Sequence, residues 1–106
     1  MDIKSTDTFE KSLAKLYKKD KQLLDTLEAL ITELQENPSL GTSLGGGRYK
    51  VRIPNKSNNK GKSGGYRVIT YTKMEETILL VYIYSKSKIE NILESKIDEI
   101  ISTYKI

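Results

Sequence analysis

Residues 48–53 read Arg-Tyr-Lys-Val-Arg-Ile, and this short stretch decides the fold. Cationic and apolar side chains alternate along it, which is the period of a β-strand with one face toward a core and the other toward solvent. The strand ends at Pro54, because proline lacks the N–H that a strand ladder uses. We therefore predict a sheet on which Arg48, Lys50 and Arg52 share one face.

Two more strands are predicted after this one. Residues 66–72 are rich in aromatic and β-branched side chains, and residues 77–84 are almost continuously apolar. A continuously apolar strand is typical of the centre of a sheet, where both faces are covered. With a turn at residues 73–76, these segments predict an antiparallel meander. Residues 1–5 are a candidate for a short additional strand at the sheet edge.

A helical period replaces the strand period ahead of the sheet. After a predicted N-cap at Asp7 or Thr8, apolar residues recur every three or four positions, interrupted by a polar run at residues 18–21. Asn37 ends the pattern, because the proline that follows it disfavours helical geometry at the preceding residue. This region therefore predicts a helical hairpin.

Polar and glycine-rich segments connect these elements. Residues 39–47 contain four Gly and three Ser or Thr, which predicts a connecting loop, and residues 55–65 predict a longer polar loop. After the strands, residues 87–90 have the spacing of a capping box. The apolar stripe beyond it predicts a C-terminal helix, which Asn91 or Ser95 could divide into two pieces.

A length of 106 residues allows one small domain and leaves no room for a second core. We predict a single α+β domain over residues 1–106, with an N-terminal helical hairpin packed on a small, mainly antiparallel sheet of three to four strands and a C-terminal helix. The longest apolar run, residues 78–84, is too short to cross a membrane. The first residues also lack the apolar core of a signal peptide. These features predict a cytoplasmic protein with no membrane partner.

Cys and His are both missing from the chain. Their absence excludes disulfides, zinc-thiolate sites and thiol nucleophiles, and it leaves acid–base chemistry to Lys, Arg, Tyr or carboxylates. The carboxylates that form clusters outside the first helices fall on a predicted turn or on the polar face of a helix, so no metal site is predicted. They are Glu75, Glu76, Glu94, Asp98 and Glu99.

The net charge of +4 hides a strong asymmetry. Residues 37–74 contain no Asp or Glu and carry a charge of +8, whereas the rest of the chain carries −4. Such a concentration of cations indicates a polyanionic partner, either nucleic acid or an acidic protein segment.

Cations from two neighbouring strands and the loop between them are predicted to converge. Neighbouring strands lie about 4.8 Å apart, so several of these side chains can reach one phosphate. They are Lys50, Arg52, Lys60, Lys62 and Arg67. A lysine among other cations loses its proton more readily than an isolated one and could act as a base. The competing interpretation is an exposed sheet edge protected by charge.

Two other signals are weaker. Residues 61–63 read Gly-Lys-Ser and match the end of a phosphate-binding P-loop, but the first Gly of that motif is missing and a strand follows instead of a helix. Among the strand tyrosines, Tyr49 and Tyr82 are assigned to the core, whereas Tyr66 and Tyr84 are open to stacking on bases.

Residues 48–53, 60–69 and 83–87 together resemble the RelE/ParE superfamily of type II toxins. The run Lys-Gly-Lys-Ser-Gly-Gly-Tyr-Arg-Val at residues 60–68 is similar to the HigB-like branch of the RelE group. The resemblance covers nearly the whole chain and implies a helical hairpin on a small, twisted, mainly antiparallel sheet. It also implies a ribosome-dependent endoribonuclease that cuts mRNA in the decoding site and that a cognate antitoxin holds inactive.

The resemblance assigns catalytic positions by matching motifs. Those positions are Lys50, Arg52, Arg67 and Lys86. The first two match the basic positions of the family's strand, the third matches its Gly-x-Arg motif, and the fourth follows the last strand. Two family positions differ, because Ser87 stands at an arginine and Leu93 at a tyrosine.

A second set of residues is predicted to bind RNA: Arg48, Lys60, Lys62 and Tyr66. The hypothesis is that an RNA 2′-hydroxyl attacks the adjacent phosphorus, with no metal and no cofactor. The expected partners are the ribosome, mRNA and an antitoxin with an acidic segment that covers the basic face. The alternatives are a ParE-like toxin that inhibits DNA gyrase without nuclease activity, and a noncatalytic RNA-binding module.

Overall fold

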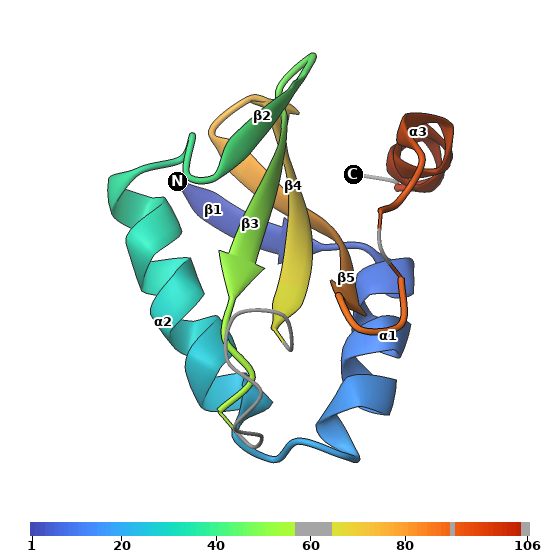
Figure 1. The fold of residues 1–106 in the computed structure, drawn as a ribbon. Helices are drawn as coiled ribbons and strands as arrows, with labels where there is room; N and C mark the ends of the chain where they lie inside the picture. The colour runs from blue at the N-terminus through green and yellow to red at the C-terminus, as the bar shows by residue number, and fades with distance from the viewer. Residues whose placement is uncertain (57–64, 90, 105–106) are drawn as a thin grey trace.

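The computed structural model describes residues 1–56, 65–89 and 91–104. These residues form three helices and a five-stranded mixed sheet with the strand order β1-β5-β4-β3-β2 (Figure 1). In chain order the elements are β1 (Asp2–Ser5), α1 (Asp7–Tyr17), α2 (Leu23–Glu36), β2 (Thr42–Gly45), β3 (Arg48–Ile53), β4 (Tyr66–Met74), β5 (Thr77–Ser85) and α3 (Glu94–Thr103). No helix within the described ranges is both long and apolar enough to cross a bilayer.

The α+β class is confirmed, but the predicted number of three to four strands is wrong. β1 pairs in parallel with β5, which confirms the candidate edge strand and puts a strand ahead of the helical hairpin. β2 lies within residues 39–47, for which the sequence predicts only a loop, and it pairs antiparallel with β3. This strand has only four residues and a single apolar side chain, Leu44, so its strand character comes from pairing with β3 rather than from its own pattern.

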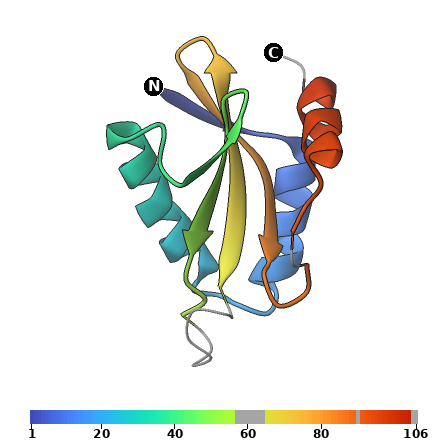
Figure 2. The same ribbon diagram turned by 45° about the horizontal axis from the view of Figure 1, so that its top comes forward.

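The sheet carries a hydrophobic core on each face. α1 and α2 cover one face, and α3 packs on the other, so that α2 and α3 lie on opposite sides of the strands (Figure 2). β5 contributes to both cores, with Ile78 and Leu80 facing the hairpin and Leu79 and Val81 facing α3. The prediction of a central strand covered on both faces is therefore confirmed.

Thr6 is the N-cap of α1, one residue before the predicted candidates. Its hydroxyl accepts a hydrogen bond from the Phe9 backbone N–H at 2.9 Å and donates one to the Val81 carbonyl at 2.7 Å. The first bond satisfies a helix N-terminal donor, and the second fixes the helix against β5. A single buried side chain thus sets where α1 begins and which strand it packs on.

A buried carboxylate closes the turn between α1 and α2. Asp20 is only 3% exposed. Its oxygens accept hydrogen bonds from the Gln22 backbone N–H at 3.0 Å and from the Tyr66 hydroxyl at 2.9 Å. Because Tyr66 is the first residue of β4, this contact ties the hairpin turn to the start of that strand.

The C-terminal helix begins later than the sequence predicts. α3 starts at Glu94, and the hydroxyl of Ser87 lies 2.9 Å from that of Ser85 instead of capping a helix. Ile89 and Ile92 still pack against the core beneath α3, but they do so from the segment that leads into the helix. The three-residue spacing of Ile89 and Ile92 made the predicted helix start too early, because a non-helical segment that lies along a core can have the same spacing.

Candidate functional site

Two arginines and a tyrosine form a row across three strands. Arg52 on β3 lies opposite Arg67 on β4, and Arg67 lies opposite Tyr84 on β5. Directly opposite residues point to the same face, with Cβ atoms about 4.5–5.5 Å apart. Like charges in that position destabilise a sheet unless an anion lies between them. This row therefore has the charge and spacing of an anion site.

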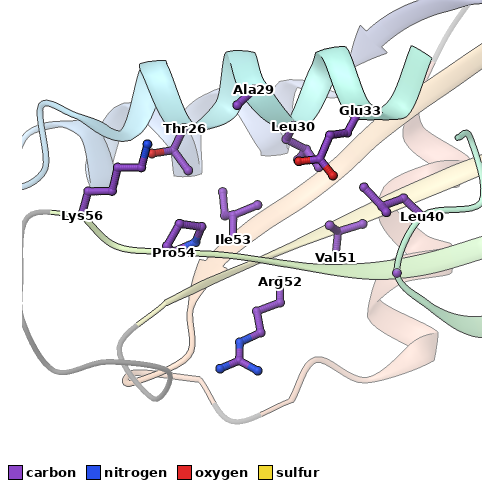
Figure 3. Close-up of a pocket in the computed structure, with 11 residues that line it drawn as sticks. Thr26, Ala29, Leu30, Glu33, Leu40, Val51, Arg52, Ile53, Pro54 and Lys56 are labelled. Atoms are coloured by element: carbon purple, nitrogen blue, oxygen red, sulfur yellow. The ribbon is translucent and has the colours of Figure 1, made fainter. Parts of the chain in front are cut away.

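The alternation predicted for β3 is confirmed by its burial. Val51 and Ile53 are buried against the hairpin, whereas Arg52 is exposed on the other face. Figure 3 shows Val51 and Ile53 on the α2 side of the strand and Arg52 pointing away from it. Lys50 shares the face of Arg52, and its Nζ lies 3.4 Å from the Asn91 side-chain oxygen.

Lys86 lies close to this row through the backbone. Its N–H donates to the Gly65 carbonyl at 3.0 Å, at the end of β5 and directly before β4. Any Cβ on Gly65 would lie 2.6 Å from the Ile53 carbonyl oxygen, so a glycine is required where β3 and β4 approach. The structure thus brings Lys86 to the same end of the sheet as Arg52 and Arg67.

Arg48 has partners that the sequence does not reveal. Its guanidinium forms ion pairs of 3.1 Å with Glu94 and Asp98 on α3, and it donates to the Gly45 carbonyl at 3.0 Å. Its side chain is only 16% exposed. Arg48 therefore joins α3 to the sheet, and its role in binding RNA stays a prediction. The one feature of the sequence that could have indicated these ion pairs is the four-residue spacing of Glu94 and Asp98, which puts both carboxylates on one helix face.

Tyr66 is not available for stacking, which corrects the prediction that it binds RNA. It is 3% exposed and packs in the core under the hairpin, on the face opposite to Arg67. Burial, the hydrogen bond to Asp20 and the charge of Asp20 raise the pKa of the Tyr66 hydroxyl well above its usual value. The alternation of β4 explains this outcome, since Tyr66 shares its face with Val68.

Tyr84 is a candidate site residue that sequence reasoning left open. It is 2% exposed, and its hydroxyl has no hydrogen-bond partner among the described residues. Burial raises the pKa of Tyr84, and the charge of Arg67 partly opposes this shift. Its ring stacks on that of Tyr82, which packs against the α3 core as predicted. Only the strand register, which a sequence does not give, reveals that Tyr84 faces Arg67.

Lys60 and Lys62 lie outside the described residues. The groove drawn in Figure 3 has a volume of about 420 Å³ and lies between α2 and β3. Its walls include Leu30 and Val51, which belong to the hairpin side of the sheet. Arg52 also borders this groove through its position on β3, but its side chain points away from α2 (Figure 3), and Arg67 is not among the lining residues.

Comparison with known proteins adds one finding to this geometry. The model of the family described as the RelE toxin of the RelE/RelB toxin-antitoxin system matches residues 1–105. A search of curated proteins found no match. The matched range includes the three strands that carry Arg52, Arg67 and Tyr84 and all three helices.

Proposed function

The chain belongs to the RelE toxin family, and from this premise we propose that it is a ribosome-dependent endoribonuclease that cleaves mRNA and is neutralised by a cognate antitoxin. The observation that carries the proposal is the pairing of Arg52 with Arg67 on one face of the sheet. Two guanidinium groups held side by side suit a phosphate, since each can donate two hydrogen bonds to its oxygens.

The proposed reaction needs only groups carried by the RNA and by this chain. The 2′-hydroxyl attacks the adjacent phosphorus, the bond to the 5′-oxygen breaks, and the products are a 2′,3′-cyclic phosphate and a 5′-hydroxyl. Lys50 or Lys86, in its neutral form, accepts the 2′ proton, and a second, protonated side chain donates a proton to the leaving 5′-oxygen. Arg52 and Arg67 stabilise the charge that develops on the phosphoryl oxygens. No metal or cofactor is part of this proposal.

The decisive test is mRNA cleavage by Arg67→Ala in a purified translation system. Removing one donor to a developing charge lowers a rate by about 10²–10³-fold, and we expect a loss of this size. Lys73→Ala is the matched control, because Lys73 is an exposed cation near the other end of β4. We expect it to cleave like wild type. Unchanged cleavage by Arg67→Ala would rule out the assignment, and gyrase-dependent DNA breaks without mRNA cleavage would favour the ParE-like alternative.

A further inference from the structure

A groove with cationic walls lies between α1 and the second half of β5. β1 pairs only with residues 77–80 of β5, and beyond that point α1 lies along the strand instead. The groove between them has a volume of about 370 Å³. Tyr82 and Tyr84 line it from β5, Lys15 and Lys19 from α1 and the turn that follows, and Lys88 from the turn after β5.

The charge of this groove is unbalanced. Its described lining contains three lysines and no carboxylate, and none of the three forms an ion pair within the described part of the chain. Lys19 and Lys88 line the same groove, and the interaction with Lys19 lowers the pKa of Lys88. Like charges held this closely favour the binding of an anion between them.

The groove and the candidate site share one residue. Tyr84 lines the groove and is also the cross-strand neighbour of Arg67. An RNA with one phosphate at Arg67 would therefore have its neighbouring phosphates near the side of β5 on which the lysines lie. The half-buried ring of Tyr82 also lines the groove, and its centroid lies 6.0 Å from that of the Tyr84 ring, on which it stacks.

We propose that the groove between α1 and the second half of β5 binds backbone phosphates of the RNA that flanks the scissile bond, through Lys15, Lys19 and Lys88. This inference rests on the proposed function and extends it to a site that neither the sequence motifs nor the family match assigns. RNA is favoured over an acidic peptide because Tyr84, which lines the groove, is the cross-strand neighbour of Arg67 in the proposed cleavage site.

The test measures binding of a fluorescent 2′-O-methyl RNA oligonucleotide, which cannot be cleaved, over a range of salt concentrations. Each contact to a single-stranded phosphate contributes about 0.7 to the slope of log affinity against log salt. The triple variant Lys15→Ala, Lys19→Ala and Lys88→Ala should therefore lower that slope by roughly 2. All three side chains are exposed, so the variant should fold normally.

A triple variant of equal charge provides the matched control. Lys4→Ala, Lys73→Ala and Lys96→Ala remove exposed lysines that do not line the groove, and this variant should keep the wild-type slope. A wild-type slope in the groove variant would overturn the inference. If the groove variant still binds RNA like wild type but no longer binds a poly-glutamate peptide, the inference is also overturned, in favour of a protein ligand. If wild type fails to cleave mRNA while the slope still falls in the groove variant, the proposed function fails and the groove assignment stands.

Discussion

At the scale of single residues, Tyr66 and Tyr84 are both buried, but they lie on opposite faces of the sheet and have different surroundings. Tyr66 donates its hydroxyl hydrogen to Asp20 under the hairpin, whereas the Tyr84 hydroxyl faces the cationic side with no described partner. An unsatisfied buried hydroxyl costs about 1–3 kcal/mol. Sites that bind ligands commonly carry such costs, because the group is satisfied only in the complex. Tyr84 is thus the residue that best marks the arginine row as a site.

The raised pKa of Tyr66 predicts a loss of stability in alkali. The unfolded chain releases this proton near pH 10, while the folded chain retains it to higher pH. The unfolded state therefore binds fewer protons, and the free energy of unfolding should fall as pH rises above about 10. Urea unfolding of wild type and Tyr66→Phe across this range measures the effect.

The Tyr66→Phe variant separates two contributions to stability. At neutral pH it should lose about 1–2 kcal/mol, because it removes the buried hydrogen bond to Asp20. Above pH 10 its stability should fall less steeply than that of wild type, since the residue that titrates is gone. Parallel curves for the two proteins would contradict the assignment of the alkaline loss to Tyr66.

At the scale of secondary-structure elements, the two carboxylates of α3 hold that helix to the sheet. Glu94 and Asp98 are 60% and 63% exposed, so their ion pairs with Arg48 are screened by solvent. Glu94→Gln with Asp98→Asn should lower the free energy of unfolding by less than about 1 kcal/mol. The same variant should speed hydrogen exchange in α3, because the helix loses its charged contacts to β3. Glu99→Gln, which removes the Lys96 contact within α3, is the control.

The pattern of hydrogen exchange in this double variant distinguishes a local contact that holds α3 from a contribution to the stability of the whole fold. Faster exchange confined to α3 would confirm that Arg48 holds the helix in place. Equal acceleration in β4 and β5 would show instead that the variant weakens the whole fold. Exchange at the wild-type rate would mean that packing of Ile97 and Ile100 alone fixes α3.

The central strands β3 and β5 were predictable because the sequence pattern of each is compatible with only one type of secondary structure. Alternation in residues 48–53 and the apolar run of residues 77–84 each specify a strand and its faces. β2 was not predictable, because its pairing depends on β3 rather than on its own side chains. The start of α3 was missed because Ile89 and Ile92 have helical spacing without helical backbone. Within the site, Arg52 and Arg67 followed from alternation, but the position of Tyr84 needed the register.

At the scale of the whole molecule, positive charge is concentrated in residues 37–74, and the proposed antitoxin should bind to this basic part of the chain. We expect an adjacent reading frame to encode a small acidic protein, and its coexpression should suppress mRNA cleavage. Because charge would contribute to this complex, its affinity should fall as salt rises. Isothermal titration at low and high salt measures this dependence. Equal affinity at both salt concentrations would contradict recognition through the basic residues 37–74.

The parallel pairing of β1 with β5 also determines when the fold can close. Residues 2–5 are synthesised well before their partners, residues 77–80. Contacts between segments so distant in sequence form late, since the intervening segments must be present before the loop can close. A nascent chain that ends before β5 has neither complete core nor the Tyr84 neighbour of Arg67. The topology thereby delays assembly of the arginine row with its Tyr84 neighbour until β5 has been synthesised.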